Sequence, residues 1–149
     1  MASASSLATL IDLAVQGVDD AAKLLQKLAT DRKNAESQLA TLLVYRQDYA
    51  DRLQKSAESG VSASNYHNFR QFIATLDEAI SQQNSVVAQI DARVEQGRQQ
   101  WYAQKRRLNS FEALRERQVQ HQVVRNNRIE QRASDEVSAT IYRRLHHSH

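Results

Sequence analysis

The most constraining feature of this chain is a row of mostly apolar residues that recurs at alternating steps of four and three through its first 53 positions. Twelve of the fourteen positions in this row are apolar: Leu7, Ile11, Ala14, Val18, Ala21, Leu25, Leu28, Arg32, Ala35, Leu39, Leu42, Arg46, Tyr49 and Leu53. A spacing that averages about 3.5 residues keeps facing one neighbour only if the helix winds around that neighbour left-handedly. The row therefore predicts a coiled coil with a second helix.

A second row with the same spacing follows, and ten of its thirteen positions are apolar: Phe69, Ile73, Leu76, Ile80, Gln83, Val87, Ile90, Val94, Gly97, Trp101, Gln104, Leu108 and Phe111. Gly60 and the serines of segment 56–64 are the best break between the rows, because Gly accepts positive φ and Ser side chains compete for backbone hydrogen bonds. Folding the chain at this break places Leu53 opposite Phe69 and Leu42 opposite Ile80.

We therefore predict an all-α fold in which two long helices form an antiparallel, left-handed coiled-coil hairpin, a single elongated domain over residues 1–149. Helix one is expected over about residues 6–55 with Ser5 or Ser6 as its cap, the turn over about 56–64, and helix two over about 65–140. Beyond Leu114 helix two has no partner left in its own chain. Its C-terminal part is expected to be unpaired or frayed.

The composition agrees with a thin helical molecule. The chain has no Pro, three Gly and no Cys, and its mean hydropathy is −0.65. Without Cys there are no disulfides, thiol nucleophiles or common structural zinc sites. The N-terminus has no basic leader and no apolar run is long enough to span a membrane. We expect a soluble, non-secreted protein without direct membrane insertion.

Catalysis and cofactor binding are not expected on such a scaffold. A two-stranded rod scarcely offers a concave pocket, and the sequence has no dinucleotide-binding, Walker, HExxH or CxxC motif. His67 and His121 are isolated, and the final HHSH is too short and terminal to predict a metal site. Adjacent carboxylates such as Asp19 and Asp20 point about 100° apart on a helix and cannot act as a facing pair. We predict no enzyme, no cofactor and no metal site.

Basic charge is concentrated in the second half of the chain. Residues 93–132 hold ten Lys or Arg against four Asp or Glu, although the formal net charge is only +3. The KRR run at 105–107 allows a basic-helix nucleic-acid binder as an alternative. Glu112 and Glu116 interrupt the run, and the zipper partner is the same chain rather than a second one. We therefore favour a protein that binds no nucleic acid.

A further stripe lies beside the two rows, and the hairpin register brings its parts together. Tyr45, Phe72 and Ala79 lie next to the rows, where partial exposure is favoured, whereas Leu42, Tyr49 and Leu76 are row members that can simply widen the core. An exposed apolar stripe on a soluble rod indicates a surface for a partner. We name it the aromatic strip, and its members are Gln38, Leu42, Tyr45, Tyr49, Phe72, Leu76 and Ala79.

Several segments in a fixed order resemble the FliJ family of the bacterial flagellar type III export apparatus. They are LATLIDLAVQGVDDAAKLL at 7–25, SNYHNFRQFIATLDEAI at 64–80 and FEALRERQ at 111–118, together with the Tyr45/Tyr49 pair and Trp101. The resemblance implies a cytoplasmic export factor, peripherally associated with the inner membrane at the flagellar base. It also implies a coiled coil similar to the γ subunit of rotary ATPases, which binds the flagellar export ATPase hexamer and the export-gate membrane protein FlhA. Family members are described as chaperones or escort factors for export chaperones or substrates.

Carried over by position, the export-gate surface of the family corresponds to the aromatic strip. The last member of that surface is a histidine in the family, whereas this chain has Gln83, which can hydrogen-bond but cannot take up a proton. For the ATPase we expect contacts from charged residues of the first turns and of the C-terminal helix: Asp12, Asp19, Asp20, Arg115, Arg117, Arg125 and Arg128. The alternative to an export role is a generic structural coiled coil that self-associates.

Overall fold

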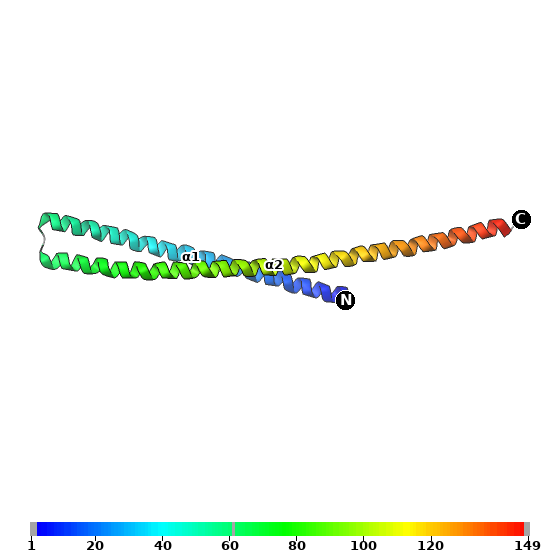
Figure 1. Cartoon of the computed structure of the whole chain (residues 1–149), viewed down its shortest axis with the longest axis horizontal. Helices are drawn as coiled ribbons and strands as arrows, with labels where there is room; N and C mark the ends of the chain where they lie inside the picture. The colour runs from blue at the N-terminus through cyan, green and yellow to red at the C-terminus, as the bar shows by residue number, and fades with distance from the viewer. Residues whose placement is uncertain (1–2, 61, 148–149) are drawn as a thin grey trace. The chain divides into compact units, whose positions relative to one another are not determined.

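A computed structural model describes residues 3–60 and 62–147 of the chain, and it consists of two helices. Helix α1 spans Ala4–Ser59 and helix α2 spans Ala63–His147. The two helices are joined by a short connection and pack against each other as an antiparallel hairpin (Figure 1). No strand occurs in the described residues. The predicted all-α coiled-coil hairpin is confirmed.

Both helices start at a serine cap. The Ser3 hydroxyl oxygen accepts a hydrogen bond from the Ser6 amide at 3.2 Å, and the Ser62 hydroxyl oxygen accepts one from the Asn65 amide at 3.4 Å. These bonds satisfy amides that the first helical turn leaves without partners. The first cap is thus Ser3 and not Ser5 or Ser6, because the Ser3 hydroxyl lies three residues before the amide from which it accepts.

The connection between the helices is shorter than the expected turn over about 56–64. Helix α1 continues to Ser59, and the Ser59 hydroxyl donates to the carbonyl oxygen of Lys55 at 2.9 Å. Gly60 follows with φ of 75°, in the left-handed region, which is the usual way for a glycine to end a helix. Ser56 and Ser59 therefore belong to α1, Ser62 caps α2, and only residues 60–62 separate the two helices.

The chain divides into two compact units, and each helix contributes to both. One unit takes the residues up to Val18 and those from Gln104 onward. Its core consists of Leu7, Ile11, Ala14 and Leu108, all buried, with Val18 and Phe111 packed against them. These six side chains belong to the two predicted rows.

The other unit, Asp19–Ala103, has a thinner core. Leu28, Ala35 and Gly97 are buried, and the remaining row members in this unit are half-buried except Arg32, which is exposed. Arg32 instead forms ion pairs with Asp91 of α2 and Glu36 of its own helix. A two-helix core leaves one flank of each row residue open, so most row side chains are only partly covered.

The C-terminal part of α2 carries no buried residue. All residues from 119 to 147 are exposed, and α2 nevertheless remains helical to His147, beyond the expected end near residue 140. The N-terminal turn of α1 comes close to α2 near its residues 118–125, where Ala4 helps to line a shallow hollow. From about residue 126 onward the helix gains nothing from packing against α1.

Candidate functional site

The aromatic strip lies in the Asp19–Ala103 unit, and its two helices meet at a pair of stacked rings. The rings of Tyr49 on α1 and Phe72 on α2 have centroids 5.2 Å apart and planes inclined by 12°. Phe69 adds a tilted ring at 6.3 Å from Tyr49. The structure therefore brings Tyr49 and Phe72, strip members from the two helices, into contact across the hairpin.

The strip combines exposed and half-buried residues. The side chains of Tyr45 and Phe72 are 53% and 56% exposed, and Gln38 is exposed as well. The half-buried members are Leu42, Tyr49, Leu76 and Ala79. The half-buried members hold the two helices together, while the exposed aromatic faces remain available for contact with another molecule.

Charged side chains frame the strip. Arg46 of α1 forms an ion pair across the hairpin with Asp77 of α2. The hydrogen bond that Arg46 donates to Asp77, followed by the negative charge of Asp77, raises the pKa of Arg46 above its ordinary value. The guanidinium of Arg52 lies 5.5 Å from the centre of the Tyr49 ring, within the range of a cation–π contact. Of these two contacts, the Arg46–Asp77 pair joins the two helices and favours this register at the strip.

At the other end of the strip, Gln83 reaches from α2 to α1. Its amide nitrogen donates to the backbone carbonyl oxygen of Ala35 at 2.9 Å and to Oε1 of Gln38 at 3.3 Å. The sequence placed Gln83 in the second row, but it gave no reason to expect these particular acceptors. Its place in the row was the one sequence signal for a bond to α1, since a polar residue that faces the partner helix needs a hydrogen-bond partner there.

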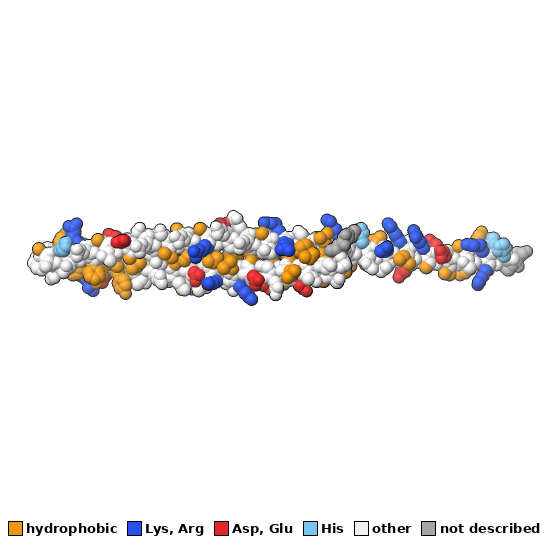
Figure 2. Space-filling model, turned by 90° about the horizontal axis from the view of Figure 1, so that it is seen from below, with side chains coloured by type: hydrophobic (Ala, Val, Ile, Leu, Met, Phe, Trp, Pro, Cys, Tyr) orange, Lys and Arg blue, Asp and Glu red, His pale blue; other side chains and the backbone are white. Residues whose placement is uncertain are grey.

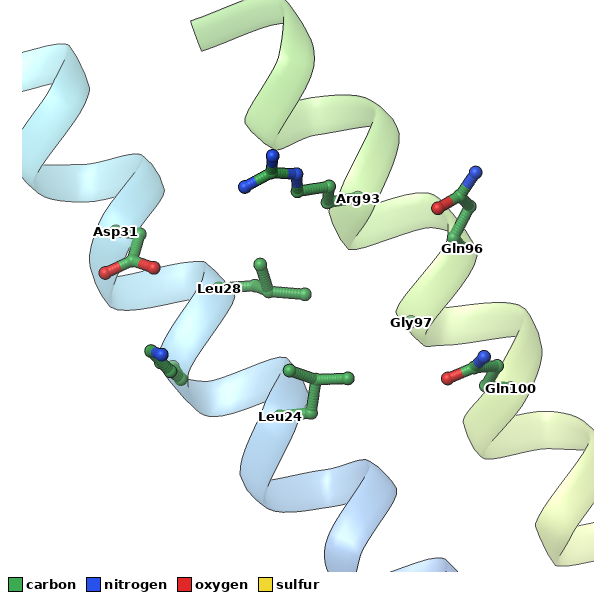
Figure 3. Close-up of a pocket in the computed structure, with 8 residues that line it drawn as sticks. Leu24, Leu28, Asp31, Arg93, Gln96, Gly97 and Gln100 are labelled. Atoms are coloured by element: carbon green, nitrogen blue, oxygen red, sulfur yellow. The ribbon is translucent and has the colours of Figure 1, made fainter. Parts of the chain in front are cut away.

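The Asp19–Ala103 unit also has a hollow at Gly97. Figure 3 shows Leu24 and Leu28 of α1 directed toward α2, where Gly97 has no side chain, with Arg93 and Gln100 at the rim. A Cβ atom at Gly97 would lie 3.2 Å from a methyl carbon of Leu25 and 3.4 Å from one of Leu28. Gly97 thus allows the leucines of α1 to approach the α2 backbone closely.

The residues expected to contact the ATPase are divided between the two units. Asp12 and the four arginines lie in the unit that contains the chain ends, whereas Asp19 and Asp20 belong to the other unit. All seven are exposed. None of them takes part in an ion pair among the described residues, where the pairs are Arg32–Glu36, Arg32–Asp91, Arg46–Asp77, Arg52–Asp48 and Arg98–Glu95.

The four arginines also differ in direction along α2. Arg125 and Arg128 are three positions apart and therefore share a face, whereas Arg115 and Arg117 are two apart and point to different sides. Figure 2 shows Lys and Arg side chains interspersed with acidic ones on the visible face of the C-terminal part of α2. Among these four arginines, Arg125 and Arg128 are therefore the pair that places two positive charges on the same face of α2.

The histidines of α2 do not form a metal-binding cluster among the described residues. His67 and His121 are exposed on α2, and His146 packs against Tyr142 with ring centroids 4.0 Å apart. Ser148 and His149, the end of the HHSH run, lie outside the described residues. No group of three or more His, Cys, Asp or Glu suited to a metal ion occurs in residues 3–60 and 62–147.

Neither helix, over its described length, contains a stretch that is long and apolar enough to cross a bilayer.

The comparisons with known proteins agree on one family. A family model described as "Flagellar FliJ protein" matches residues 3–146. Proteins named "Flagellar FliJ protein" from Escherichia coli (strain K12) and Salmonella typhi are each 35% identical to this chain over 136 residues, which is 91% of this chain and 92% of each relative.

Proposed function

Because this chain belongs to the flagellar FliJ family, we propose that it is a non-catalytic coiled-coil component of the flagellar protein export apparatus. Its partners in this proposal are the export ATPase hexamer and the export-gate membrane protein FlhA, and it escorts export chaperones or substrates. It acts in the cytoplasm, peripherally associated with the inner membrane at the flagellar base. The helical hairpin suits a part that links two partners, since a continuous helix transmits position along its length.

Binding to the export gate is assigned to the aromatic strip. The observation that supports this assignment is the exposure of the Tyr45 and Phe72 rings, each by more than half, on a frame made of packed row residues. Large exposed aromatic groups on a rigid support are typical of the residues that dominate binding energy in protein interfaces. The stacking of Phe72 on Tyr49 holds one of these rings in place before a partner arrives.

A double substitution tests the strip. Tyr45→Ala with Phe72→Ala is expected to weaken binding to purified FlhA at least about tenfold, because two exposed aromatic contacts are lost. Helicity by circular dichroism should stay near that of the wild type, since neither side chain is buried. Val44→Ala is the matched control, because Val44 is 66% exposed on the same helix and outside the strip. Unchanged FlhA affinity of the double variant would exclude the strip as the gate-binding surface.

Binding to the ATPase is assigned to the charged residues near the chain ends, with Arg125 and Arg128 as its clearest part. Their support is that both side chains are exposed and unpaired with any acidic residue in the described chain, and that they share one face of α2 where its contact with the first turn of α1 ends. Charged groups in this setting steer a partner of opposite charge and set the rate of association.

Charge reversal tests this second surface. Arg125→Glu with Arg128→Glu is expected to weaken ATPase binding, and the loss should shrink as salt is raised because screening shortens the range of the interaction. The control is Lys23→Glu with Lys33→Glu, which changes the net charge equally in the other unit. Equal loss of ATPase binding in both variants would indicate a net-charge effect and refute the assignment.

A further inference from the structure

Gln83 is a row residue of α2 whose side chain is bonded to α1 and not directed to solvent. Its amide nitrogen donates to the carbonyl oxygen of Ala35 at 2.9 Å and to Oε1 of Gln38 at 3.3 Å. A backbone carbonyl oxygen only accepts hydrogen bonds, so the nitrogen of the Gln83 amide must face Ala35. Ala35 itself is buried, with 5% exposure. Both amide hydrogens of Gln83 are therefore used inside the hairpin.

The second of these bonds orients Gln38. Because Oε1 of Gln38 faces Gln83, the Gln38 amide nitrogen is turned away, and no described residue accepts its hydrogens. The neighbouring Thr41 hydroxyl donates to the carbonyl oxygen of Ser37 at 3.0 Å, so its hydrogen is already used. These residues line a shallow hollow together with Leu42 of the aromatic strip. The hollow thus combines an apolar wall with a directed N–H donor.

We propose that Gln83 is a positioning residue for the aromatic strip: it holds Gln38 so that this end of the strip presents N–H donors to a hydrogen-bond acceptor on the partner. The proposal rests on the assignment of the strip as a partner-binding surface. The matching group on the partner is a carbonyl or carboxylate oxygen, next to an apolar side chain that packs on Leu42 and Tyr45. Gln83 contributes through Gln38 and has no free donor of its own for the partner.

The positioning can be measured in the free protein, without any partner. In the wild type the side-chain amide of Gln38 should give ordered nitrogen-15 relaxation, because one of its atoms is tied to α2. Gln83→Met removes both donors and keeps an unbranched side chain of similar volume in the row, so the Gln38 amide should become mobile. Gln82→Met, one position earlier on an exposed part of α2, is the control. Equal mobility of Gln38 in all three proteins would refute the positioning role.

A double-mutant cycle with purified FlhA tests the presented donor. Loss of one neutral hydrogen bond corresponds to about a three- to tenfold weaker affinity, and Gln83→Met should show a loss of this size in the wild-type background. In the Gln38→Ala background the same change should cost less than about twofold, since there is nothing left to position. Additive losses would mean that Gln83 touches the partner directly or acts through general stability, and would overturn the proposal.

Gln38→Glu separates the donor from the bond that holds it. A glutamate at this position still accepts from Gln83 but offers no hydrogen to a partner at neutral pH. FlhA affinity should therefore fall at least as far as with Gln38→Ala, and wild-type affinity would overturn the proposal. The assignment of the strip fails if the wild-type protein does not bind FlhA, or if the variant with Tyr45→Ala and Phe72→Ala binds FlhA normally. The proposed chemistry of the partner then fails as well. The relaxation measurements still decide whether Gln83 positions Gln38.

Discussion

Two glycines, Gly60 and Gly97, determine where the chain reverses and how closely the two helices approach. Gly60 has φ of 75°, and no atom beyond its own chain neighbours lies within 4 Å of where a Cβ would be, so its role is conformational. Gly97, in contrast, is needed for space, because a Cβ there would meet the side chains of Leu25 and Leu28. Two glycines of one chain thus serve different physical purposes.

The conformational role of Gly60 gives a direct prediction. Gly60→Ala should lower the free energy of unfolding by about 1 kcal/mol or slightly more, because an L side chain with a Cβ disfavours the left-handed region. Gly60→Asn should cost clearly less, since asparagine visits that region more readily. Urea unfolding of the three proteins measures the difference. Equal stabilities of the alanine and asparagine variants would contradict this account of the turn.

The two helices differ in how much of their length is supported by packing. Almost all of α1 faces α2, whereas every α2 residue from 119 to 147 is exposed. Helices in water obtain most of their stability from burial of an apolar face, and a short isolated helix is marginal. The C-terminal stretch also bears exposed apolar residues, among them Val137, Ile141 and Leu145, on four-residue steps. It is the part of the chain with the least tertiary support.

Amide hydrogen exchange should therefore show a gradient along α2. Amides between about residues 73 and 108 are expected to be protected most, because the helix there is held by row contacts, and protection should fall steeply from about residue 126. Mass spectrometry of overlapping peptides after exchange measures this profile. Uniform protection from residue 73 to residue 147 would mean that the C-terminal stretch has a partner, for instance a second copy of the chain.

For the molecule as a whole, the most important property is that both helices of the coiled coil belong to one chain. The cross-hairpin contacts Arg46–Asp77 and Tyr49–Phe72 form within a single polypeptide. Folding of such a hairpin is unimolecular, whereas a coiled coil that assembles from separate chains gains stability as the protein concentration rises. The alternative of a self-associating structural coiled coil differs in just this respect.

Thermal unfolding distinguishes the two possibilities. The Tm of the wild-type protein should be the same over about a hundredfold range of protein concentration, because no association step contributes to its stability. Circular dichroism at the low end and calorimetry at the high end provide the measurement. A Tm that rises steadily with concentration would support self-association and would weaken the proposed role as a single-chain link between the ATPase and the gate.

The periodic rows were readable from the sequence because their signal is repeated. All but one of the 27 row positions are at least half-buried, and the exception, Arg32, carries a long charged side chain that forms ion pairs at the edge of the interface. An error at one position changes little when many others specify the same face. The helix pairing, the reversal at Gly60 and the partial exposure of Tyr45 and Phe72 follow from that repetition.

Other features depended on where individual atoms lie in the folded chain. The choice of Ser3 as the first cap, the close approach of Leu28 to Gly97 and the bonds from Gln83 to Ala35 and Gln38 are of this kind. Each rests on one contact, and a contact is made or lost when the facing helix moves by an ångström or a side chain changes its rotamer. Heptad spacing specifies which face is buried, but the distance between the helices and the side-chain rotamers are set only when the two helices pack.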